Sequence, residues 1–228
     1  SPLGVFVASR QAEASLVIRD KRFGKEHAER PIRRYGPKIM DEPAFRSLGL
    51  MMLQQDPPDH TRLRGLVVKA FTARRVEDMR PQIQQIVDEA LDRIIPQGKM
   101  DLIEDFAFRL PVTIICAMLG IPEDHREVFY RSSRDGGRLL DPVPLTPAEI
   151  EQANAGNAMA QMYFQQLFEL RRRSPGEDLT TQLVQAEEDG RKLSNEELTA
   201  NIILLFGAGH ETTVNLIGNG LLALHRNP

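Results

Sequence analysis

A glycine-rich polar patch interrupts the apolar, helix-periodic segment LLFGAGHETTVNLIG, residues 204–218. Within it, Gly209 removes a side chain from one helical face, and Thr212 places a hydroxyl about one turn later on the same face. Glu211 supplies a carboxylate beside that hydroxyl. A glycine inside a helix costs about 1 kcal/mol relative to alanine, so the patch needs a reason. A carboxylate and an alcohol beside a gap in a helix surface could relay protons.

Two other interpretations of this patch follow from the same residues. In the first, the glycines let another helix approach, the hydroxyls of Thr212 and Thr213 bond to carbonyls one turn earlier, and Glu211 faces water. This helix-crossing alternative stays open. In the second, His210 and Glu211 begin the His-Glu-x-x-His motif of a zinc protease. Val214 stands where that motif needs its second histidine, so the zinc site is excluded.

A second candidate site lies in the segment HTRLR, which places His60 and Arg64 four residues apart. On a helix, residues at this spacing share a face. An imidazole and a guanidinium together can hold a carboxylate or a phosphate, the guanidinium in a bidentate manner. The alternative is a solvated basic face with no ligand.

One long helix must carry the glycine-rich patch. Ser194 and Glu197 have the spacing of a capping box, and no proline follows before Arg226. A helix over these residues would be roughly 50 Å long, enough to cross a whole domain.

The rest of the chain also favours helices. The sequence predicts a mainly α fold, with a small amount of β near the N-terminus at Leu3–Ala8 and no repeating strand–helix pattern. Glycines and prolines predict a loop over Arg22–Met52, of a length typical of functional lids. The segment KMDLIEDFA, residues 99–107, is predicted to be extended.

Composition limits the class of protein. The chain has 228 residues, 41% of them hydrophobic, and a net charge of −3. We expect a single globular domain over residues 1–228, with no footprint for nucleic acid. Its one cysteine, Cys116, excludes an intrachain disulfide and favours a reducing compartment. No apolar run is long enough for a membrane span and no signal peptide opens the chain, so a cytoplasmic location is expected.

The motifs taken together resemble one family. DPPDHTRLR is followed in order by FT, DLIEDFA, LPVTIICAMLGIP, LTAN and LLFGAGHETT. This series resembles the amino-terminal part of a bacterial cytochrome P-450, a haem-thiolate monooxygenase, over nearly the whole chain. The resemblance implies a partial cytochrome P-450 fold with a long central helix.

The resemblance also assigns roles to individual residues. It implies that His60 and Arg64 hold a haem propionate. Ala208 and Gly209 would line the groove where dioxygen sits over the iron. Glu211 and Thr212 would be an acid–alcohol pair. The Arg22–Met52 loop and the turn at Asp141–Pro147 would shape the substrate pocket.

The same resemblance implies the reaction and its participants. The cofactor would be haem b, with O2 as co-substrate and electrons from NAD(P)H through a ferredoxin-type donor. The substrate would be a lipophilic small molecule that is hydroxylated or epoxidised. Neither a nucleic acid nor a membrane is an expected partner.

The chain departs from the family pattern in one respect. The family needs a cysteine thiolate in a glycine-rich loop near its carboxyl end, and this sequence stops at Pro228 without one. Cys116 lies in an apolar helical segment and is expected to be a core residue, so no axial metal ligand is predicted in this chain. We therefore expect a fragment of a longer monooxygenase. The alternatives are a truncated, inactive relative, or an all-α regulator that binds hydrophobic ligands. The lack of a basic DNA-contacting patch argues against the regulator.

Overall fold

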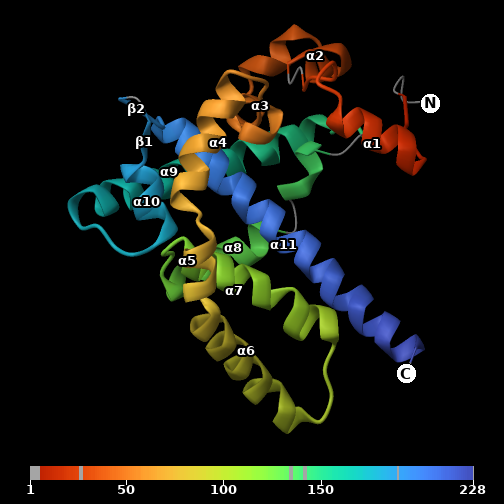
Figure 1. The fold of residues 1–228 in the computed structure, drawn as a ribbon, viewed down its shortest axis with the longest axis vertical. Helices are drawn as coiled ribbons and strands as arrows, with labels where there is room; N and C mark the ends of the chain where they lie inside the picture. Colours follow the sequence, from red (N-terminus) through yellow and green to blue (C-terminus); the bar gives the residue numbers. More distant parts are fainter. Residues whose placement is uncertain (1–5, 26–27, 134–135, 141–142, 189, 228) are drawn as a thin grey trace.

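The computed structural model describes residues 6–25, 28–133, 136–140, 143–188 and 190–227, and these are almost entirely helical (Figure 1). The α-helices are α1 (Gln11–Arg19), α2 (Glu29–Tyr35), α3 (Pro43–Leu50), α4 (Asp59–Ala70), α5 (Ala73–Asp78), α6 (Arg80–Ile94), α7 (Arg109–Met118), α8 (Arg126–Ser133), α9 (Pro147–Arg173), α10 (Leu179–Gln185) and α11 (Asn195–Arg226). Short 3₁₀ segments are η1 (Pro37–Asp41), η2 (Met52–Gln54), η3 (Ile95–Gln97), η5 (Glu123–His125) and η6 (Gly136–Leu140), and η4 (Leu102–Ala107) is a π-helix. The strands β1 (Glu187–Glu188) and β2 (Arg191–Lys192) form an antiparallel hairpin.

Helix α11 has the start and the length that the sequence predicts. Ser194 Oγ accepts the Glu197 N–H at 3.1 Å, and the Glu197 carboxylate accepts the Ser194 N–H at 2.9 Å, which completes the capping box. From the β-hairpin, α11 crosses the molecule diagonally to its far edge (Figure 1). This long central helix is therefore confirmed, and it carries the glycine-rich patch in its middle.

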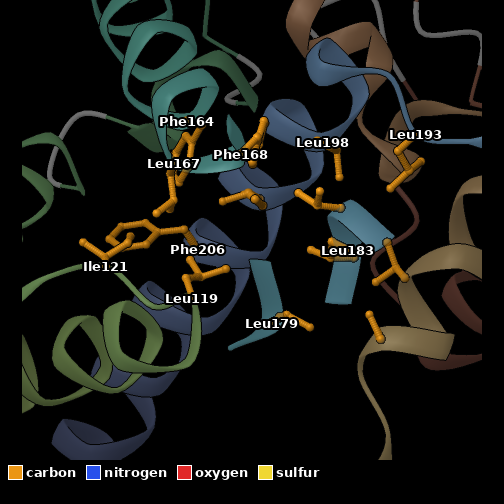
Figure 2. Packing of buried hydrophobic residues seen from close by; sticks show 14 of the residues in the cluster. Leu119, Ile121, Phe164, Leu167, Phe168, Leu179, Leu183, Leu193, Leu198 and Phe206 are labelled. Carbon is orange, nitrogen blue, oxygen red and sulfur yellow. The ribbon is translucent and has the colours of Figure 1, made fainter. Parts of the chain in front are cut away.

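The main core forms around the first half of α11. Leu198, Ile202 and Phe206 project from this helix into a cluster that also takes side chains from α4, α7, α9 and α10. Figure 2 shows Phe206 and Leu198 among the labelled members of the cluster, close to Phe164 and Phe168 of α9. The core thus fixes α4 and α7, the two helices that matter for the site, against α11.

The β content is smaller than the sequence analysis predicts near the N-terminus. Of the predicted strand Leu3–Ala8, residues 1–5 lie outside the described residues, and residues 6–8 form no strand. Strands in the described part of the chain occur at the β1–β2 hairpin, which precedes α11.

The prediction of a loop over Arg22–Met52 is wrong. The segment contains α2, η1 and α3, because its prolines start helices instead of preventing them. Pro37 and Pro43 occupy the first position of η1 and α3, where a missing N–H breaks no helical hydrogen bond. Gly36, with φ +88°, ends α2 just before Pro37.

The segment 99–107 is also not extended. The Asp101 carboxylate accepts the N–H groups of Ile103 and Glu104 at 2.9 and 3.0 Å, and this cap starts the π-helix η4. This matters because η4 and the start of α7 form the surface on which the second half of α11 lies.

A second, smaller apolar cluster joins the helices after residue 28 to the start of α9. It contains Ile39, Phe45 and Leu145, and the Tyr35 hydroxyl accepts the Leu145 N–H at 2.6 Å. The turn predicted to help shape the pocket, Asp141–Pro147, falls partly outside the described residues, since 141 and 142 are not described. Its described end at Leu145 packs on the segment that contains α2, η1 and α3.

Candidate functional site

Helix α4 places the predicted basic pair on one face. His60 and Arg64 lie one turn apart on this helix, with His60 half-buried and Arg64 exposed. Neither side chain makes a hydrogen bond or ion pair with the residues that the structure describes. Continuing the same face by four and then three residues leads to Val68 and Phe71, whose side chains are 54% and 41% exposed. Two potential donors for an anion therefore adjoin exposed apolar surface.

A neighbouring arginine ties this helix to the long one. Arg62 of α4 forms an ion pair and hydrogen bond with Glu197, whose side chain is 15% exposed. Burial raises the pKa of Glu197, but the hydrogen bonds from Arg62 and Ser194 outweigh it, so the pKa lies below its ordinary value. The carboxylate is therefore ionised at neutral pH, and it fixes the start of α4 next to the start of α11.

The predicted acid–alcohol pair lies on the exposed side of α11. Thr212 Oγ1 donates a hydrogen bond to the Ala208 carbonyl at 2.7 Å, and Thr213 Oγ1 does the same to the Gly209 carbonyl at 2.9 Å. Ala208, Glu211 and Thr212 are all exposed. These hydroxyl–carbonyl bonds and the exposed carboxylate are the ones that the helix-crossing alternative predicts.

On the side where a Cβ would project, the space beside Gly209 is occupied by a side chain of α7. A Cβ at this position would lie 2.7 Å from Cδ1 of Ile115 on α7, so Ile115 already fills the space that the missing side chain leaves. Here too the helix-crossing alternative describes the contact. An added Cβ at Gly207, by contrast, would meet nothing within 4 Å. The open surface of the patch is thus at Gly207 and Ala208.

The described contacts do not bring the two predicted sites together. Glu197, which holds Arg62 beside the basic pair, is about 22 Å from Thr212 along the axis of α11. In the part of the chain that the structure describes, no hydrogen bond or ion pair joins His60 or Arg64 to Glu211 or Thr212.

The sequence analysis considers His210 only as part of the excluded zinc motif, but it is the most buried residue of the patch at 5% exposure. Its ring meets Phe108 edge-on, with ring centroids 4.7 Å apart and planes at 89°. Burial lowers the pKa of His210, although the Phe108 backbone and the charge of Glu211 act in the opposite direction. The imidazole is therefore neutral near pH 7. An imidazole at the centre of an apolar helical face was the one signal available in the sequence.

Cys116 lies where the sequence analysis expects it, in the core. Its side chain is fully buried on α7, and burial raises the pKa of its thiol to about 12. A thiol in this state is unreactive at neutral pH. Within the described ranges, no group of three or more histidine, cysteine, aspartate or glutamate side chains could hold a metal ion.

Comparisons with known proteins agree with the resemblance seen in the motifs. The family model described as cytochrome P-450 matches residues 20–228. The chain is 43% identical over 230 residues to cytochrome P-450 107B1 of Saccharopolyspora erythraea, covering 99% of the chain and 55% of that protein. It is 40% identical over 218 residues to the cytochrome P-450 monooxygenase PikC of Streptomyces venezuelae, covering 94% and 49%.

The fold is similar to that of solved structures as well. The crystal structure of P450BioI in complex with an acyl carrier protein ligated to hexadec-9Z-enoic acid superposes with a TM-score of 0.84 at 34% identity, over 95% of this chain and 54% of that one. The chain therefore spans about half the length of the relatives it matches. None of the described helices combines the length and the hydropathy needed to cross a membrane.

Proposed function

This chain belongs to the cytochrome P-450 family, and from that membership we propose that it forms the distal part of a haem-dependent monooxygenase. The reaction would insert one oxygen atom of O2 into a lipophilic small molecule, by hydroxylation or epoxidation. The observation that carries the proposal is the exposed face of α11 that bears Ala208 and Thr212. That face lies in the middle of the helix that the family motif occupies.

The described residues fit a flat apolar group that carries carboxylates. In the second half of α11, the face that continues from Ala208 and Thr212 remains exposed, and Leu216 on it is 71% exposed. An apolar macrocycle would bury such surface favourably. His60 and Arg64 supply an imidazole and a guanidinium for its acidic side chains, and no described residue competes for them.

The haem, when bound, supplies the oxygen activation and the oxidising power, and the protein supplies binding, orientation and protons. His60 and Arg64 would hold a propionate. Ala208, with the backbone at Gly209, would line the groove for dioxygen, and the small side chains of the patch would keep this groove open.

Glu211 and Thr212 would supply protons to that groove. The Glu211 carboxylate is exposed and can exchange a proton with water. The Thr212 hydroxyl now donates to the Ala208 carbonyl at 2.7 Å, a bond that keeps Oγ1 against the helix and beside the groove. Rotation about its C–O bond would redirect the hydrogen, so that Thr212 could pass a proton without a change of backbone.

The remaining participants are proposed from the family. NAD(P)H would be the source of electrons, a ferredoxin-type protein would be the donor, and the cytoplasm would be the location. One structural relative is bound to an acyl carrier protein that carries a fatty acid. A lipophilic substrate presented by a carrier is therefore one form that the substrate could take.

The test of this function is the carbon monoxide difference spectrum of the reduced, full-length protein. We expect the Soret band of thiolate-ligated haem. Arg64→Ala should reduce the amount of haem retained after gel filtration, whereas Arg74→Ala, which changes an exposed arginine of α5, should not. Absence of haem from the wild-type protein, or a band typical of a histidine-ligated haem, would overturn the proposal.

A further inference from the structure

Asn201 is a buried polar residue of α11 that the proposed function does not use. It is the last residue of the LTAN motif, and its side chain is fully buried at 0% exposure. Asparagine is a weaker helix former than leucine, and its amide costs free energy when buried unless it is hydrogen-bonded. A leucine has nearly the same shape without either cost. The hydrogen bonds of the amide must therefore account for an asparagine here.

These hydrogen bonds join α11 to the end of α3. The side-chain oxygen of Asn201 accepts the Met52 N–H at 2.9 Å, and the side-chain nitrogen donates to the Leu50 carbonyl at 3.2 Å. The same nitrogen donates to the Glu197 carbonyl of its own helix at 2.8 Å. Both amide hydrogens and the oxygen are thus used. A flipped amide would place its oxygen against two carbonyls, so the contacts fix its orientation and hold the backbone where α3 meets η2.

Glu197, one turn before Asn201, holds the far end of the same connection, since it binds Arg62 in the first turn of α4. Residues 52 and 62 are therefore both attached to one turn of α11, at points about 6 Å apart along its axis. The chain between them, residues 53–61, contains the end of η2, the turn before α4, and His60. The two attachments therefore limit where His60 lies relative to α11.

His60 depends on this connection more than Arg64 does. The buried residues of α4 begin at Leu63, so core packing holds the part of the helix that carries Arg64. No residue from 59 to 62 is buried. The His60 N–H donates to the Asp56 carbonyl at 3.1 Å, so the backbone of His60 follows the turn before it. A shift of that turn would move His60, leave Arg64 in place, and change the spacing of the basic pair.

We propose that Asn201 is a positioning residue for the basic pair. It holds the connection into α4 against α11, and so keeps His60 at the spacing from Arg64 that binds one anion. The inference deepens the proposed function and rests on it, because the anion would be the haem propionate. Asn201 is fully buried, so it acts through His60 and not by contact with the anion. A hydrogen bond weakens steeply with misalignment, which apolar packing does not, and this makes the asparagine directional.

Asn154 of α9 offers a matched control at the other end of α3. Its side chain accepts the Ala44 N–H at 3.0 Å and donates to the Glu42 carboxylate. Both asparagines thus bind the backbone of one helix, but only Asn201 does so next to the connection into α4. Asn201→Leu and Asn154→Leu keep the size of each side chain and remove its polar atoms.

The variants are compared as full-length, haem-loaded proteins. The measurements are amide hydrogen exchange over residues 43–46 and 50–60, the rate of haem transfer to apomyoglobin, and the urea midpoint. Combining Asn201→Leu with His60→Ala and, separately, with Arg64→Ala gives two double-mutant cycles.

We expect Asn201→Leu to speed amide exchange over residues 50–60 and to release haem about tenfold faster than the wild type. A tenfold change is about 1.4 kcal/mol, close to the worth of one hydrogen bond to a charged group. Asn154→Leu should speed exchange over residues 43–46 and release haem at the wild-type rate, although its urea midpoint also falls. In the His60→Ala background the effect of Asn201→Leu should shrink to less than about twofold, and in the Arg64→Ala background it should remain.

Three results would overturn the proposal. They are wild-type haem release from Asn201→Leu, equally fast release from both asparagine variants, or an undiminished effect in the His60→Ala background. If Asn201→Leu does not fold, Asn201→Asp replaces it, because its carboxyl group still accepts the Met52 N–H. Faster haem release from Asn201→Asp would support the proposal and a wild-type rate would contradict it. Amide exchange needs no haem, so it tests the attachment separately from the proposed function, whose failure would appear in the wild-type spectrum.

Discussion

Replacing Gly209 by alanine tests the contact between α11 and α7. The new Cβ would lie 2.7 Å from Ile115 Cδ1 and 3.4 Å from Ile115 Cγ1. Ile115 is 6% exposed, so its end cannot swing into solvent and must displace other core atoms. Gly156→Ala, on α9, is the matched control, because a Cβ there meets nothing within 4 Å.

Two opposing terms set the size of the effect. Alanine in place of a helical glycine stabilises by about 1 kcal/mol, and this term is the same at both positions. Overpacking a core costs about 1–3 kcal/mol, and this term applies at Gly209 alone. We expect Gly156→Ala to be stabilising by about 1 kcal/mol and Gly209→Ala to range from neutral to about 2 kcal/mol destabilising.

The assay is urea unfolding of the full-length protein, with Ile115→Val completing a double-mutant cycle. Valine lacks Cδ1, so Gly209→Ala should be less harmful in the Ile115→Val background, by about 1–2 kcal/mol. If Gly209→Ala stabilises as much as Gly156→Ala, or if the two changes are additive, then Ile115 does not fill the space at Gly209.

Four further outcomes are expected. Thr212→Ala should raise the share of electrons lost as hydrogen peroxide while haem binding persists, and unchanged coupling measured by product and peroxide assays would argue against the relay. Arg64→Ala should weaken haem retention, measured by dialysis against apomyoglobin, more than it changes the product profile, and normal retention would make Arg64 a surface charge. Asp178→Asn should lower the free energy of unfolding by about 3 kcal/mol, because it removes the charge that pairs with Arg171 in a largely buried place. Arg171 Nε and Asp178 Oδ2 are 2.6 Å apart, and the two side chains are 17% and 10% exposed. A change in the urea midpoint no larger than that of a surface mutation would contradict this prediction. In the folded state the pKa of His210 is below its ordinary 6.5, so at low pH the unfolded chain binds more protons than the folded one, and the free energy of unfolding should fall as the pH drops below about 6.5. In urea titrations of His210→Phe this pH-dependent loss of stability should be absent. Identical pH profiles for the variant and the wild type would refute the prediction.

The accuracy of prediction from the sequence depends on how local the deciding interactions are. Helix α11 begins after Ser194 as predicted because its capping box needs only residues one turn apart. The helices around Pro37 and Pro43 were predicted as loop because a proline that starts a helix and one that prevents a helix have the same local sequence signal. The cap at Asp101 was missed for a similar reason: an aspartate before an apolar run is equally compatible with a strand.

In the candidate site too, the features that depend on nearby residues were predicted and those that depend on distant residues were not. The spacing of His60 and Arg64 sufficed to place them on one face of a helix. Ile115 fills the space at Gly209 because of how α7 packs on α11, and α7 lies about 90 residues earlier in the chain. No residue within one turn of Gly209 indicates this contact. The burial of His210 likewise depends on Phe108.

Glu197 has a consequence for how variants of this protein would combine. One of its oxygens completes the cap of α11 and the other binds Arg62 of α4, so a single side chain joins the helix of the basic pair to the helix of the acid–alcohol pair. Loss of this carboxylate would shift both helices at once. Changes at Glu197 should therefore alter cofactor affinity and proton delivery together, and their effects should not be additive with those of mutations in either pair.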